Sequence, residues 1–254
     1  MTKSPTQTIE VSRRGRAVTL TFNRPEARNA LAPQDIAQLN ALLDECHNDP
    51  DVQVVVLTGN GSAFCAGADI KHVNKLSGPQ MATFIESWTQ ALIRIVTMPK
   101  IVVAAVNGAC AGGGSHIMLC SDFCVASSAA SFHFTAALKG LPDLELGSLL
   151  LPMTVGLKRA KWLMLRGGIV SVEQAVDYGF CNAVFPEDKW GAELDVFVDE
   201  LASHPPGPVA HTKHALNQHA YQMLGPVKLS AIAGGLYMSA LTDLPAGKLK
   251  GARS

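Results

Sequence analysis

The sequence lacks several features that would point to particular classes of protein. Its 21 Lys and Arg residues balance 21 Asp and Glu residues, and it shows no basic stripe of the kind that nucleic-acid-binding surfaces carry. Its longest apolar stretches are broken by Gly, Pro or a charged residue well short of a membrane span. We therefore expect neither a nucleic acid nor a membrane as a partner.

Cysteine pairs with the spacing of a metal site are also absent. None of the six cysteines belongs to a CxxC pair or to a cluster with histidine, so no metal site is expected. The cysteines lie inside apolar segments, which is typical of buried free thiols in a reducing compartment. Residues 1–16 lack the apolar core of a secretory signal. These observations together predict a cytoplasmic protein.

The order of apolar segments predicts an α/β domain. The 254 residues, 48% of them hydrophobic, are enough for one sizeable core. Continuous or alternating apolar runs predict strands, and helical spacing predicts amphipathic helices. The expected strands lie within 7–22 (two strands), 52–59, 101–106, 123–127 and 131–135, and the expected helices are 33–48, 79–97, 115–120, 155–167, 171–179 and 208–224. Residues 204–208, HPPGP, form the one linker-like stretch.

Two of the apolar strands end in loops of small residues. Residues 54–70 read VVVLTGNGSAFCAGADI, and residues 99–122 read PKIVVAAVNGACAGGGSHIMLCSD. A backbone N–H can approach a ligand closely only where side chains are small, so Ala-Gly-Ala and Gly-Gly-Gly suit an oxyanion hole. The second loop also opens a helix, whose N-terminal amides favour a developing negative charge. We therefore predict that the two loops are halves of one oxyanion hole.

These two strings resemble the crotonase superfamily, also called the enoyl-CoA hydratase/isomerase family. The segments NRPEARNAL (23–31) and RAKWLMLRGGIVSVEQAVDYGFCNAVFP (159–186) share the resemblance, which thus covers nearly the whole chain. It implies an α/β fold of the ββα spiral type and an acyl-CoA thioester as substrate, with no further cofactor. It also implies a homotrimer or homohexamer, with an acyl-CoA-binding core over 1–203 and a helical trimerisation region over 204–254.

Carried over residue by residue, the resemblance implies roles for two groups of residues. The backbone amides of Ala68 and Gly113 would point at the thioester oxygen. The residues expected to line the CoA site are Arg24, Arg28, Ala30, Ala66, Asp69 and Ile70, and a cation there suits a phosphate. The acyl end of the pocket is expected to include Phe84, Trp88 or Leu138.

The sequence departs from the family pattern at the acid–base positions. Hydratases of the family carry two glutamates, where this sequence has His116 and Ala136. Water addition needs one group that activates the water and an acid that protonates the α-carbon, and alanine can do neither. Isomerisation needs only one mobile proton carrier, so it tolerates the loss best, and lyase or hydrolytic chemistry stays open. The alternative is a CoA-thioester-binding protein with weak or no catalysis.

Three residues are candidate proton carriers. His116 near a helix N-terminus can act as a base near pH 7, or it can be a hydrogen-bonded residue that lines a pocket. The isomerase and dehalogenase branches of the family carry one carboxylate in the stretch that is 140–152 here, which offers Asp143 and Glu145. Without a gap Leu144 occupies the expected position, so either neighbour can serve.

Three further residues near these loops are weaker candidates. His133 could face the same cavity, and we interpret it as structural. Cys110 and Ser115 lie beside the glycine loop, but neither has an evident orienting base, so no nucleophile is expected there.

Overall fold

The computed structural model describes residues 8–140, 143 and 146–242. Its strands are β1 (Ile9–Arg14), β2 (Ala17–Phe22), β3 (Val54–Gly59), β4 (Ala63–Cys65), β5 (Ile101–Val106), β6 (Ala109–Ala111), β7 (Phe123–Ser127), β8 (Ser131–Phe134), β9 (Gly168–Ser171) and β10 (Ala183–Phe185). Its α-helices are α1 (Pro33–Asn48), α2 (Ile70–Val73), α3 (Gly78–Thr97), α4 (Gly113–Cys120), α5 (Leu146–Val155), α6 (Leu157–Lys161), α7 (Val172–Tyr178), α8 (Trp190–Ser203), α9 (Pro206–Leu216) and α10 (Gln218–Thr242). Short helices of other types are η1 (Pro25–Ala27), η2 (Ala137–Lys139), η4 (Glu187–Lys189) and the π-helical η3 (Trp162–Arg166).

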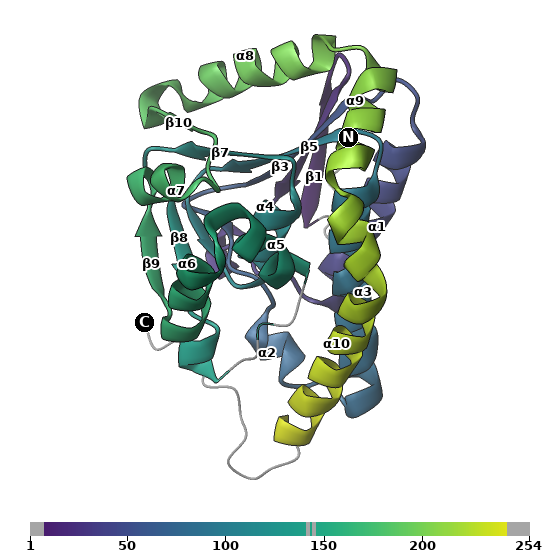
Figure 1. Ribbon diagram of the computed structural model, residues 1–254, viewed down its shortest axis with the longest axis vertical. Coiled ribbons are helices and arrows are strands. Elements are labelled where there is room, and N and C mark those ends of the chain that lie inside the picture. The colour runs from purple at the N-terminus through teal and green to yellow at the C-terminus, as the bar shows by residue number, and fades with distance from the viewer. Residues whose placement is uncertain (1–7, 141–142, 144–145, 243–254) are drawn as a thin grey trace.

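The described strands form two sheets (Figure 1). The larger sheet has the order β1-β2-β3-β5-β7-β10 and is parallel except for the β1–β2 hairpin. The smaller sheet has the order β4-β6-β8-β9 and is parallel except for its β8–β9 pair. The chain repeatedly adds one strand to the larger sheet, one to the smaller sheet, and then a helix. This repeat confirms the expected α/β fold of the ββα spiral type.

Helices cover both faces of the larger sheet, so its central strands are apolar throughout. Val55 and Leu57 of β3 belong to the main core, which also includes apolar residues of α1 and α3. Val54 and Val56 point the other way and pack in a second cluster with residues of α8, which crosses that face in Figure 1. Burial on both faces explains the continuous apolar run that the sequence shows here.

One predicted helix and the predicted linker differ from what the structure shows. The helix expected over 155–167 begins at Leu157, because α5 occupies the preceding residues and Gly156, with φ 80°, breaks the chain direction between them. Residues 204–208 are not a free linker, since α9 already starts at Pro206. Proline is tolerated at this first helical position, because an N–H there would have no acceptor within the helix. The helix expected over 171–179 is present as α7, and Ser171 caps it with its side chain accepting from the Gln174 N–H.

The C-terminal helices pack against their own chain. Helix α10 runs alongside α3 over much of its length (Figure 1). Helix α9 is anchored by Lys213, whose buried ammonium donates to Ile95 O (3.0 Å), to Lys100 O (2.9 Å) and to Asp122 Oδ2 (2.7 Å). Helices α9 and α10 thus pack within their own subunit.

Candidate active site

The loop after β4 leaves one backbone N–H facing away from its neighbours. Ala68 forms a bridge with Leu31, in which the Leu31 N–H donates to Gly67 O (2.8 Å) and the Asp69 N–H donates to Leu31 O (2.9 Å). In this parallel pairing only Leu31 uses its own N–H and C=O, so those of Ala68 point to the other side. Among the described residues, no backbone acceptor takes the Ala68 N–H.

The loop after β6 brings a second amide to the same place. Gly113 is the first residue of α4, so its N–H has no acceptor within the helix. Gly112 before it has φ 53° and ψ −126°, a conformation that side chains disfavour. A Cβ on Gly67, which has φ 87°, would lie 2.5 Å from the Gly113 nitrogen. The two loops therefore meet backbone to backbone, and the residues predicted as oxyanion donors, Ala68 and Gly113, belong to adjoining segments.

His116 and Asp143 form a close pair beside these loops. His116 is the fourth residue of α4, and its Nε2 lies 2.6 Å from Asp143 Oδ1, with the two side chains 7% and 20% exposed. Ser148 Oγ, on the first turn of α5, lies 2.8 Å from the same Oδ1. Of the two candidate carboxylates, Asp143 contacts His116. The other candidate, Glu145, lies outside the described residues.

The surroundings of Asp143 keep its carboxyl group ionised. Burial alone would raise the pKa, but attraction to His116 and the hydrogen bonds from His116 and Ser148 outweigh it, so the pKa of Asp143 lies below its ordinary value. Residue 147 is glycine, which leaves room beside α5 for the ring of His116. A Cβ on Gly147 would lie 2.4 Å from His116 Nδ1. The start of α5 therefore supports both members of the pair. Sequence reasoning missed Gly147 and Ser148, whose only signal was their place shortly after Asp143.

The second expected glutamate position holds no acid–base group. Ala136 directly precedes η2, and its methyl side chain cannot carry a proton. Nearby His133 on β8 has its Nε2 2.9 Å from Ser131 Oγ. Burial lowers the pKa of His133, and the charges of Lys139 and Arg28 lower it further. This local hydrogen bond and neutral state are consistent with the structural interpretation of His133.

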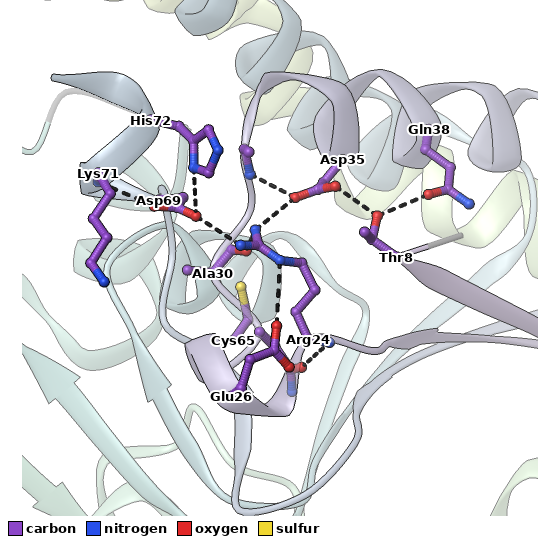
Figure 2. A network of polar contacts seen from close by, with 12 residues as sticks. Thr8, Arg24, Glu26, Ala30, Asp35, Gln38, Cys65, Asp69, Lys71 and His72 are labelled. Carbon is purple, nitrogen blue, oxygen red and sulfur yellow. Dashed lines mark hydrogen bonds and ion pairs between the residues drawn. The ribbon is translucent and has the colours of Figure 1, made fainter. Parts of the chain in front are cut away.

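Three of the residues expected at the CoA site belong to one polar network (Figure 2). The guanidinium of Arg24 donates to Ala30 O (2.9 Å), to Asp35 Oδ2 (3.1 Å) and to Asp69 Oδ2 (3.0 Å). His72 Nδ1 is 2.9 Å from the same Asp69 oxygen. Burial would raise the pKa of Asp69, but hydrogen bonds from Arg24 and His72 hold it below its ordinary value. Arg24 is thus engaged with two carboxylates and fixes the loop that carries Ala68.

Arg28 has a more open position than Arg24. Its backbone carbonyl accepts from the Ala66 N–H (3.0 Å), and its side chain is exposed. Ile70 begins α2 and packs partly on the main core. Arg28 and Ala66 therefore lie side by side at the rim of the first loop, with the cationic group of Arg28 available to a ligand.

An aromatic pair from α3 reaches the second loop through Trp88. The rings of Phe84 and Trp88 are 6.0 Å apart, and a Cβ on Gly113 would lie 1.9 Å from Trp88 Cζ2. Both aromatic side chains are buried, which suits the apolar wall expected at the acyl end. Leu138, by contrast, is 66% exposed and does not share this buried position.

Two further features near the site concern the thiol of Cys110 and the possible metal ligands. Cys110 Sγ lies 3.9 Å from Ser115 Oγ, and burial raises the pKa of the Cys110 thiol. Within the described ranges, no three His, Cys, Asp or Glu side chains gather as metal ligands. The same ranges contain no helix long and apolar enough to cross a membrane.

Comparison with known proteins gives consistent matches over most of the chain. The profile of the enoyl-CoA hydratase/isomerase family matches residues 14–233. The (E)-benzylidenesuccinyl-CoA hydratase of Thauera aromatica is 34% identical over 213 residues, covering 82% of this chain and 80% of the relative. The 1,2-epoxyphenylacetyl-CoA isomerase of Escherichia coli is 33% identical over 205 residues, covering 79% and 78%. The crystal structure of an enoyl-CoA hydratase from Mycobacterium avium subsp. paratuberculosis superimposes with a TM-score of 0.83 at 28% identity, covering 96% of this chain and 93% of that one.

Proposed function

The chain belongs to the enoyl-CoA hydratase/isomerase family, and from this premise we propose that it moves a proton within an acyl-CoA thioester through a stabilised enolate. The enzymes that it resembles include both hydratases and isomerases. Isomerase-type chemistry fits this site best. The observation that carries the proposal is the buried His116–Asp143 pair (2.6 Å) beside Gly113, at a site where Ala136 replaces the second glutamate.

The proposed reaction uses one carboxylate twice. Asp143 removes a proton from the α-carbon of a 3-enoyl thioester, so that the C–H bond breaks and a carboxyl O–H bond forms. The electron pair moves to the thioester oxygen, where the amides of Ala68 and Gly113 stabilise the negative charge. Asp143 then returns the proton to the γ-carbon, which leaves the double bond conjugated with the thioester. His116 holds Asp143 in place throughout.

CoA recognition is proposed at the rim of the first loop. Arg28 and Lys139 are close enough for their charges to lower the pKa of His133, so two cationic side chains gather there. Such a group suits the phosphates of CoA. Arg24 contributes differently, because its guanidinium is held by Asp35 and Asp69.

We further propose that the protein works as a homotrimer or homohexamer. Six large apolar side chains on packed neighbouring elements are each more than half exposed, and they are Leu138, Met153, Leu157, Trp162, Leu165 and Ile169. In the view of Figure 1, α6 and β9 of this surface lie away from α10. An apolar surface of this kind is typical of a subunit interface.

The proposal is tested by following trans-3-hexenoyl-CoA as it becomes the conjugated 2-enoyl thioester. Replacing Asp143 by Asn is expected to lower turnover by about 10²–10⁴-fold, the usual contribution of a positioned acid–base group. Asp177→Asn is the matched control, because Asp177 is an exposed aspartate on α7 and should leave turnover unchanged. His116→Ala is expected to lower turnover as well. Full activity in folded Asp143→Asn protein would refute the assignment.

The second candidate function is thioester binding without catalysis, and Ala136 is the observation that favours it. Calorimetry with CoA and crotonyl-CoA distinguishes the two functions. Binding of both compounds with no turnover of any enoyl thioester would favour the binding protein. Hydration of crotonyl-CoA at the rate of a two-glutamate enzyme would contradict both, since it requires a second acid–base group.

A further inference from the structure

The two carboxylate oxygens of Asp143 have different surroundings. Oδ1 lies 2.6 Å from His116 Nε2 and 2.8 Å from Ser148 Oγ. Among the described residues, no hydrogen-bond donor contacts Oδ2. The side chain is 20% exposed, so it is neither sealed off nor freely hydrated. Two donors thus converge on one oxygen of the group that the proposed function uses as its proton carrier.

Ser148 has a fixed position relative to this carboxylate. It lies in the first turn of α5, where it is partly buried, and its neighbour Gly147 packs on the His116 ring. Its Oγ also lies 3.0 Å from the backbone O of Asp143. Because a hydroxyl has one hydrogen, it is shared between this carbonyl and Oδ1. Ser148 therefore ties both the backbone carbonyl and the carboxylate of Asp143 to α5.

A carboxylate with two donors on one oxygen is no longer symmetric. A freely rotating carboxylate presents either oxygen to a substrate, whereas hydrogen bonds to Oδ1 hold the group in one orientation. Hydrogen bonding also stabilises charge on the oxygen that accepts it, so the other oxygen becomes the better proton acceptor. The arrangement at Asp143 leaves Oδ2 as that acceptor.

We propose that Ser148 is a positioning residue for the reaction, which together with His116 holds Oδ1 of Asp143 and so assigns proton transfer to Oδ2. This inference rests on the proposed function, because it requires Asp143 to be the proton carrier. In the transfer step the substrate C–H bond breaks as the Oδ2–H bond forms. The same oxygen then gives the proton back, while Oδ1 keeps its two donors.

The test compares Ser148→Ala and Ser148→Thr in the complete protein with trans-3-hexenoyl-CoA. Ser148→Ala is expected to lower kcat by about tenfold, which corresponds to the lower end of the value of a hydrogen bond to a charged group. KM should be unchanged. The acid limb of the pH profile should move to higher pH, because loss of a donor raises the pKa of Asp143. Ser148→Thr keeps the hydroxyl and should restore both kcat and the pH profile.

Ser203→Ala is the matched control, since Ser203 is an exposed serine at the end of α8 whose Oγ donates only to Glu200 O in the described structure. A change in Ser148→Ala that is limited to thermal stability, with kcat and the acid limb unmoved, overturns the inference. Loss of kcat that Ser148→Thr does not restore also overturns it. Full activity of Asp143→Asn is a separate outcome, which refutes the proposed function itself.

Discussion

Replacing Gly147 by alanine adds one methyl group next to the His116–Asp143 pair. This change should disturb the geometry of the pair while leaving both of its side chains unaltered. A Cβ at this position would lie 2.4 Å from His116 Nδ1 and 3.0 Å from His116 Cα. An ordinary van der Waals contact begins near 3.4 Å, so the ring must move by about 1 Å. A displacement of that size disturbs the contact between Nε2 and Asp143 Oδ1, which are now 2.6 Å apart.

The expected loss follows from this displacement. A misplacement of about 1 Å at a catalytic constellation costs about 10²-fold in rate, and we expect that decrease in kcat for Gly147→Ala with trans-3-hexenoyl-CoA. The overpacking should also lower the free energy of unfolding by about 1–3 kcal/mol, as measured in urea. In a His116→Ala background the ring is gone, so the added methyl group should cost less stability there.

Gly191→Ala provides the matched control. Gly191 lies in α8, and a Cβ there would meet nothing within 4 Å. This variant should keep full activity and gain about 0.5–1 kcal/mol, because alanine loses less conformational entropy in a helix than glycine does. If Gly147→Ala has wild-type kcat and wild-type stability, the contact between α5 and His116 does not hold the pair in place.

Three further predictions concern the stability and assembly of the protein. Lys213→Met should lower the free energy of unfolding, by up to about 3 kcal/mol in urea, because it leaves the partly buried Asp122 without its cation; an unchanged midpoint would contradict this. Since the folded pKa of Asp143 lies below the ordinary value of 3.8, its contribution to stability is complete above that pH and is lost as the pH falls through the folded pKa. Asp143→Asn should therefore lack this part of the acid-induced loss, and identical pH dependence in both proteins would count against the pair. Leu165→Glu should reduce the mass measured by light scattering to that of a smaller species, whereas a wild-type protein that is already monomeric at micromolar concentration would refute the proposed oligomer.

The long helices and strands could be predicted because their buried residues follow a regular spacing in the sequence. The strands at 54–59 and 101–106 are apolar on both faces, and the helices at 33–48 and 79–97 show helical spacing of their buried residues. The three-residue strands β4 and β6 are too short to show any period, although they carry the site loops. Helix α5 contains Pro152, which normally argues against a helix interior.

The part of the candidate site that the backbone loops form could be predicted from the sequence. Small residues such as Gly67 and Gly112 mark where two chains approach closely, and the structure brings those loops together. Which side chains pair with one another could not be predicted. Arg24 was expected to face a phosphate, yet in the structure its guanidinium is engaged with Asp35 and Asp69, because a cation on a loop pairs with whichever carboxylates the fold brings near.

The pairing of His116 with Asp143 also bears on which reaction the site can begin. Because the pKa of Asp143 is lowered, its carboxylate is ionised at neutral pH and can accept a proton but holds none to donate. Water addition needs an acid that already holds a proton for the α-carbon, and Ala136 supplies none. A double-bond shift starts with proton removal, and the acid for its second step is created by the first. For the proposed function, the lowered pKa of Asp143 and the alanine at position 136 together favour a double-bond shift over hydration.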